Sequence, residues 1–173
     1  MTIRLNSLLI ALMMGAACSS LKEEEVLEQA EAFKQEGKYD VALMEYERYV
    51  DAFPNGEHRA EVLYELGALY QGHKKDFTKA VAFFKEVADL HSAYEKAPTA
   101  SFLVGFLYHN ELKNLDSAKV AYERFIEKYP DQELAVSARF ELANLGKAPD
   151  EIIEAGRVSE KAAVAAKKRE TRR

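Results

Sequence analysis

Histidine side chains can bind metals and serine side chains can act as nucleophiles, but in this chain neither type has the spacing of a metal site or a catalytic site. The four histidines fall in different predicted elements without metal-ligand spacing: His58, His73, His91 and His109. No glycine-rich phosphate loop, His-Glu-x-x-His pair or Cys-x-x-Cys pair occurs, and no serine lies in a nucleophile elbow. We therefore predict that the protein is not an enzyme, and we expect no metal and no cofactor.

The single cysteine, Cys18, is distinguished by what precedes it. Arg4 supplies a positive charge, residues 5–14 are mostly apolar, and three small residues at 15–17 stand directly before the cysteine. This order is typical of an export signal, and the apolar run is shorter than the roughly 20 residues that a membrane-spanning helix needs. Residues 1–17 are therefore predicted to be a signal peptide and not part of the folded body.

A cysteine after three small residues resembles the lipobox of bacterial lipoproteins, in which the cysteine becomes the mature N-terminus and carries acyl chains. Gly15 departs from the pattern, since leucine is usual there. The resemblance implies lipidation of Cys18. Because Ser19 and not aspartate follows, enterobacterial sorting rules imply the outer membrane, facing the periplasm. Two alternatives remain: an ordinary signal peptide cut after Ala17, and a buried N-terminal helix.

The predicted tether, residues 18–22, is short. Helix-forming sequence begins near Lys22, so the tether spans no more than roughly 15 Å at about 3.5 Å per extended residue. If Cys18 is lipidated, the folded body lies close to the bilayer.

The composition favours one folded domain with a well-solvated surface. Of the 173 residues, 48% are hydrophobic and 31% are charged. The net charge of -5 argues against a nucleic-acid partner. The few prolines and glycines are typical of helices separated by short turns.

Small residues repeat at an interval of 38 residues, a period that indicates stacked helical units. They are Ala42, Ala80 and Ala118 in one helix of each unit, and Gly67 and Gly105 in the other. A fourth copy begins at residue 135, with the run AVSARFELANL, and has no convincing second helix. We predict helices at 22–36, 39–53, 58–72, 76–91, 95–110, 114–129, 132–145 and 150–168.

The repeated small residues have a physical reason. A small residue where two helices cross lets their backbones approach closely. Glycine inside a helix costs about 1 kcal/mol relative to alanine, so Gly67 and Gly105 indicate close packing. Asp76, Asn114 and Asp131 stand where helix N-caps are expected.

These residues resemble the tetratricopeptide repeat (TPR), whose helix-turn-helix unit is usually about 34 residues long. The resemblance covers roughly residues 23–145. It implies an all-α fold, an α-solenoid of about three and a half helical hairpins, with the extra length in the turns and linkers. The alternative is an unrelated helical bundle.

The run from Tyr46 to Tyr70, YERYVDAFPNGEHRAEVLYELGALY, resembles TPR lipoproteins and periplasmic TPR proteins of the outer membrane. Among these are the BamD-like component of the β-barrel assembly machinery and the Tol-Pal coordinator. BamD-like proteins usually have five repeats, so the resemblance implies the class and not the specific role. It implies a scaffold in an envelope complex, such as one for outer-membrane protein assembly or envelope maintenance. The alternative is a soluble periplasmic protein of the Tol-Pal or cell-division type.

The resemblance also implies where a partner binds, since the first helix of each TPR unit lines the inner surface of the array. The positions placed there are Leu27, Tyr64, Phe102 and Phe140, with Phe106 and His109 on the same face as Phe102. Such an aromatic column suits an apolar peptide or helix. The alternative, in which these aromatics fill gaps between helices, stays open. The lysine and asparagine pattern of TPR domains that clamp a C-terminal carboxylate is absent at these sites.

The C-terminus is basic. Residues 157–173 carry a net charge of +5, so the rest of the chain carries -10. A charged end is usually solvated, and contact with anionic lipid, cell-wall polymer or an acidic partner is the alternative. We predict a TPR domain over 23–145 followed by a C-terminal helix and basic tail over 146–173. The sequence does not decide the oligomeric state.

Overall fold

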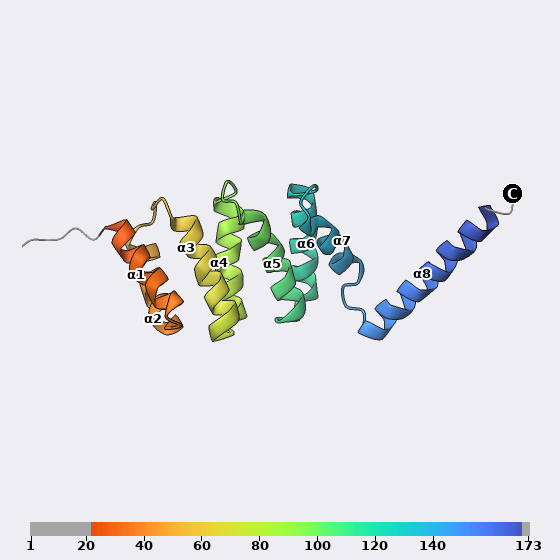
Figure 1. Cartoon of the computed structure of the whole chain (residues 1–173), viewed down its shortest axis with the longest axis horizontal. Coiled ribbons are helices and arrows are strands. Elements are labelled where there is room, and N and C mark those ends of the chain that lie inside the picture. The colour runs from red at the N-terminus through yellow and green to blue at the C-terminus, as the bar shows by residue number, and fades with distance from the viewer. Residues whose placement is uncertain (1–21, 171–173) are drawn as a thin grey trace, which may run out of the picture.

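Short helices stack side by side in one row (Figure 1). The computed structural model describes residues 22–170. In chain order the elements are α1 (Glu23–Gln35), α2 (Tyr39–Ala52), α3 (Arg59–Leu69), η1 (Tyr70–Lys74), α4 (Phe77–Leu90), α5 (Ala97–Asn110), α6 (Leu115–Lys128), α7 (Leu134–Ala143) and α8 (Pro149–Glu170). These described residues form helices and no strand, so the predicted all-α solenoid is confirmed.

The helices pair as α1 with α2, α3 with α4, and α5 with α6, and the repeated small residues lie where the partners meet. A Cβ atom on Gly67 would lie 2.7 Å from the ring of Phe84, and one on Gly105 would lie 2.8 Å from the ring of Tyr122. The prediction that these glycines mark close packing is therefore confirmed. The repeated alanines are fully buried: Ala42, Ala80 and Ala118.

The core is divided along the row into two clusters of buried side chains. The larger one extends from α1 to α5, and the smaller one lies between α6 and α7. Complete burial of one large apolar side chain contributes roughly 1.5–3 kcal/mol. Aromatic rings from the second helix of each pair are the largest fully buried side chains: Tyr46, Tyr49, Phe84, Tyr122 and Phe125.

The turn inside each pair contains a residue in the left-handed region. Gly37, Lys75 and Lys113 have φ angles of 74°, 57° and 53°, and they are spaced by the repeat interval. The helix predicted over 58–72 ends as an α-helix at Leu69 and continues as the π-helical turn η1. The π-helical turn carries the chain directly into left-handed Lys75, and this geometry ends the helix.

Two of the three predicted N-caps are confirmed. The Asp76 carboxylate accepts a hydrogen bond from the Lys79 N–H, and the Asn114 side chain accepts one from the Ser117 N–H, both at 3.0 Å. The prediction for Asp131 is wrong. Turns occupy residues 130–133, so α7 begins too late for Asp131 to cap it.

The last helix, α8, projects away from the row of paired helices (Figure 1). Its apolar side chains Ile153, Val158 and Val164 are exposed. Among the described residues α8 adds no buried side chain to either core cluster, which agrees with the prediction that the fourth unit lacks a proper second helix.

Candidate functional site

The first helices of the units, α1, α3, α5 and α7, carry the predicted partner-binding residues, and we call the surface that they form the A-helix face. At its N-terminal end, Leu27 and Tyr64 are half-buried and pack against the larger core cluster. The Tyr64 ring meets Phe84 edge-on at 5.4 Å between centroids and Tyr94 at 6.3 Å. These two predicted residues therefore serve partly as core.

The middle of the A-helix face holds a pair of stacked rings on α5. Phe102 and Phe106 lie with their centroids 6.5 Å apart. Phe102 also contacts Tyr122 and Phe125 of the smaller core cluster, at 5.9 and 5.8 Å. One side of Phe102 thus supports the fold, while both rings are only partly buried.

The C-terminal end of the face joins α5 to α7. His109 Nδ1 lies 3.2 Å from the carboxylate of Glu141 on α7. The Phe140 side chain is 56% exposed and forms part of neither core cluster. Of the six predicted residues, the structure brings Phe102 and Phe106 into contact and leaves Phe140 the most open to a partner.

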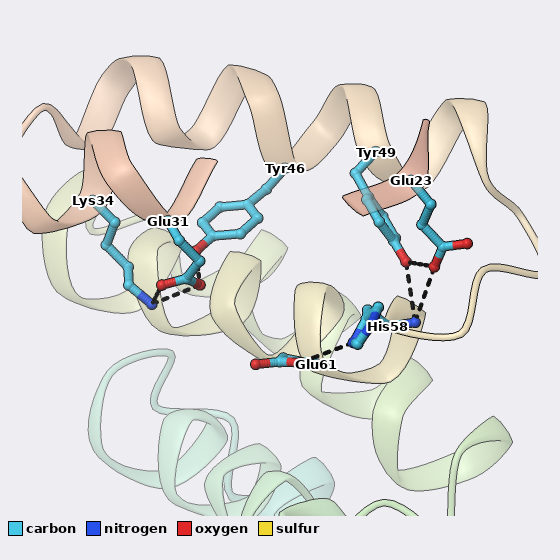
Figure 2. A network of polar contacts seen from close by, with 7 residues as sticks. All are labelled: Glu23, Glu31, Lys34, Tyr46, Tyr49, His58 and Glu61. Carbon is cyan, nitrogen blue, oxygen red and sulfur yellow. Dashed lines mark hydrogen bonds and ion pairs between the residues drawn. The ribbon is translucent and has the colours of Figure 1, made fainter. Parts of the chain in front are cut away.

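Polar side chains at the N-terminal end of the face form a network that the sequence analysis missed (Figure 2). The Tyr46 hydroxyl donates to the Glu31 carboxylate, and the Lys34 ammonium lies 2.9 Å from Glu31 and 3.1 Å from Glu65. Burial works to raise the pKa of Glu31, but the hydrogen bonds from Tyr46 and Lys34 lower it overall. The spacing of Glu31 and Lys34, three residues apart on one helix, was the sequence signal for part of this network.

A second set of contacts ties α1 to the ends of α2 and α3 (Figure 2). The hydroxyl of Tyr49 donates to Glu23, and the backbone N–H of His58 donates to the same carboxylate oxygen at 3.1 Å. The hydrogen bond from Tyr49 lowers the pKa of Glu23. The His58 ring lies 3.4 Å from Glu61, so this histidine is engaged in a structural contact.

Carboxylates dominate the charge of the N-terminal end of the A-helix face. Burial and the carboxylates of Glu61 and Glu65 raise the pKa of Tyr94 to about 12. Lys34 is paired with two carboxylates, and the Lys96 ammonium lies 5.1 Å from the centroid of the Tyr64 ring. This end of the face is therefore poorly suited to an acidic ligand, whereas the stacked rings of α5 present apolar surface.

Within residues 22–170 no group of three or more histidine, cysteine, aspartate or glutamate side chains is placed to hold a metal ion. His73 contacts Asp40 at 3.0 Å and the ring of Tyr39 at 5.2 Å, in line with a structural role. No helix in the described part of the chain is long and apolar enough to cross a membrane. Cys18 and the predicted signal segment lie outside the described residues.

Comparison with known proteins identifies the repeat. The sequence profile of the tetratricopeptide repeat matches residues 26–56, 61–93 and 99–131, which together make up more than half of the chain. The search of curated protein sequences found no match.

Two solved structures show the same fold. The second TPR domain of the human RPAP3 protein, in complex with the HSP70 peptide SGPTIEEVD, is 21% identical with a TM-score of 0.55. That match covers 73% of this chain and 96% of that one. The first TPR of Spaghetti (RPAP3), bound to the HSP90 peptide SRMEEVD, is 25% identical with a TM-score of 0.50. It covers 78% of this chain and 92% of that one.

Proposed function

Because the chain belongs to the tetratricopeptide-repeat family, we propose that it is a membrane-anchored scaffold that binds another polypeptide in a bacterial envelope complex. The repeat builds a stacked array of helical hairpins, and such arrays serve as protein-interaction scaffolds. The envelope location is our proposal from Cys18 and the residues that precede it. Outer-membrane protein assembly and envelope maintenance are the processes in which such a scaffold would act.

The observation that carries the binding proposal is the apolar half of the A-helix face. Phe102 and Phe106 are stacked and only partly buried on α5, and Phe140 is mostly exposed on α7. Aromatic rings supply contact area at little entropic cost, so this surface suits an apolar peptide or an amphipathic helix.

An apolar partner is favoured over an acidic one. The peptide in the Spaghetti (RPAP3) complex, SRMEEVD, is acidic. In this chain the Lys34 ammonium is already paired with Glu31 and Glu65. An acidic peptide would have to compete with those carboxylates, which lie on the same surface.

Binding is tested by photo-crosslinking in the native cell. A photoreactive residue in place of Phe140 should give discrete crosslinked products that disappear when Phe106 is also replaced by serine. The matched control is a photoreactive residue in place of Met44, an exposed apolar side chain on α2. Equal products from positions 44 and 140 would contradict the assignment of the A-helix face.

The anchor is tested separately by mass spectrometry of the mature N-terminus. We expect Cys18 to carry acyl chains, and we expect Cys18→Ser to move the protein from the membrane fraction to the soluble fraction. An unmodified mature protein that begins at Cys18 would instead indicate the soluble periplasmic alternative.

A further inference from the structure

On the outer side of the solenoid, the space between α2 and α4 is filled by side chains, whereas the equivalent space one repeat later, between α4 and α6, is hollow. Between α2 and α4, the ring of Phe83 stacks on Tyr70 with a centroid distance of 5.6 Å and an interplanar angle of 20°. One repeat later, between α4 and α6, tyrosine is retained as Tyr108, but alanine replaces the phenylalanine at position 121. The ring that closes the first gap therefore has no counterpart in the second.

Three further residues of the second gap are also smaller than their equivalents one repeat earlier, whereas Val120, at the position of Ala82, is larger. Ala88 stands at the position of Val50, Ser101 at that of Leu63, and Val104 at that of Leu66. The result is a pocket of about 340 Å³ whose walls come from α4, α5 and α6 and include Ala88, Ser101, Val104, Tyr108 and Ala121. This volume lies at the lower end of the roughly 300–1,000 Å³ that is typical of ligand pockets.

The rim of this outer pocket is charged. Asp89 is paired with Lys85 at 2.6 Å and with Arg124 at 2.7 Å. The two cations share this carboxylate, and both are about half exposed. Asp116, the other acidic residue of the rim, precedes Arg124 by eight residues on α6, about 12 Å along the helix axis. The end of the rim near Arg124 is therefore net positive.

We propose that the outer pocket binds an aromatic side chain of a partner polypeptide, with a neighbouring acidic residue facing Lys85 and Arg124. The aromatic ring would stack on Tyr108 as Phe83 stacks on Tyr70 in the preceding gap. The charged rim matches a carboxylate beside that ring and excludes a lysine by repulsion. This site is separate from the A-helix face, so the protein has two surfaces and joins two partner segments at once.

The test measures binding of capped dipeptides to the folded protein by NMR. N-acetyl-Phe-Glu-amide should shift the backbone resonances of Ser101, Tyr108 and Ala121 in a saturable way at millimolar concentration. N-acetyl-Phe-Lys-amide should bind at least threefold more weakly, and N-acetyl-Ala-Glu-amide should produce no saturable shift of these resonances.

Filling the pocket provides the decisive variant. Ala121→Phe restores the side chain of the preceding gap and should weaken N-acetyl-Phe-Glu-amide binding at least tenfold. Ser101→Leu fills the pocket from α5, as the second filling variant if Ala121→Phe does not fold. Phe140→Ser, on the A-helix face, is the matched control and should bind as the wild type does. The proposal is overturned if no dipeptide binds, if binding survives filling, or if N-acetyl-Ala-Glu-amide shifts the same resonances equally.

Discussion

The ring of Phe84 lies so close to the backbone of Gly67 that a methyl group on Gly67 would come within 2.7 Å of it. The same relationship recurs one repeat later, where Gly105 meets Tyr122. Both rings are fully buried, so neither can move into solvent to make room. These two contacts set the distance between the paired helices.

We therefore expect Gly67→Ala to lower the free energy of unfolding by about 1–2 kcal/mol. Overpacking of a core typically costs about 1–3 kcal/mol, and the higher helix propensity of alanine recovers part of this. Urea unfolding of Gly67→Ala, Phe84→Leu and the double variant measures the coupling. Leucine leaves space for the new methyl group, so the double variant should be more stable than the sum of the single effects predicts. Strict additivity would contradict this packing contact.

Lys75 and Lys113 hold a backbone conformation that glycine adopts more readily, as Gly37 does in the first unit. Replacement of Lys75 by glycine should raise the free energy of unfolding by about 0.5–1 kcal/mol. Glycine removes left-handed strain of roughly 1–2 kcal/mol from the folded state. Part of this gain is offset because glycine increases the conformational entropy of the unfolded chain. The control is Lys119→Gly, an exposed position in the middle of α6, which should destabilise by about 1 kcal/mol. If Lys75→Gly lowers the free energy of unfolding as Lys119→Gly does, the backbone of Lys75 is not strained.

The hydrogen bond from Tyr49 to Glu23 should make stability depend on acid pH. The folded pKa of Glu23 lies below its ordinary value of 4.5, so the ionised carboxylate stabilises the fold above about pH 4.5. That contribution is lost as the pH falls through the folded pKa. Hydrogen bonds to charged groups contribute about 1.5–3 kcal/mol, and we expect about 1 kcal/mol here because solvent reaches the carboxylate.

Thermal melting of Tyr49→Phe between pH 7 and 3 tests this relationship. The variant should melt below the wild type at pH 7 and approach it at pH 3. Tyr39→Phe, which alters an exposed tyrosine in the same helix, is the matched control and should follow the wild-type profile. A constant difference between Tyr49→Phe and wild type at every pH would contradict the pKa shift.

Replacement of the predicted binding aromatics by serine should separate structural from binding roles. Tyr64→Ser and Phe102→Ser should each lower the free energy of unfolding by about 2–3 kcal/mol, because both rings pack on core aromatics. Phe140→Ser should change it by less than about 0.5 kcal/mol, since that ring is mostly exposed. Denaturant titration measures these differences. Wild-type stability of Tyr64→Ser would mean that its ring serves only a partner.

Removal of α8 should leave the solenoid intact. The helix projects away from the row, and its apolar side chains Ile153, Val158 and Val164 are exposed. A chain ending at Gly146 should therefore melt within about 2 °C of the full protein in circular dichroism. A drop of more than 5 °C would show that α8 covers the end of the core in solution.

Much of the fold was predictable because it depends on residue type and spacing within one helix. The 38-residue interval, Gly67 and the N-caps Asp76 and Asn114 all follow from local rules of helix packing and capping. Asp131 failed as a predicted cap because the turn after Pro130 delays the start of α7. No local pattern predicts how far such a turn extends.

The sequence by itself determined a repeating array of helical hairpins, because hydrophobic period and small residues at crossing points act over a few neighbouring turns. Only the tertiary structure decided which side of each aromatic faces the core. It also placed Glu23 beside Tyr49, and it left a hollow where Ala121 replaces a ring. Each of these features depends on side chains from two or three separate helices, so their distances are set by packing and not by spacing along the sequence.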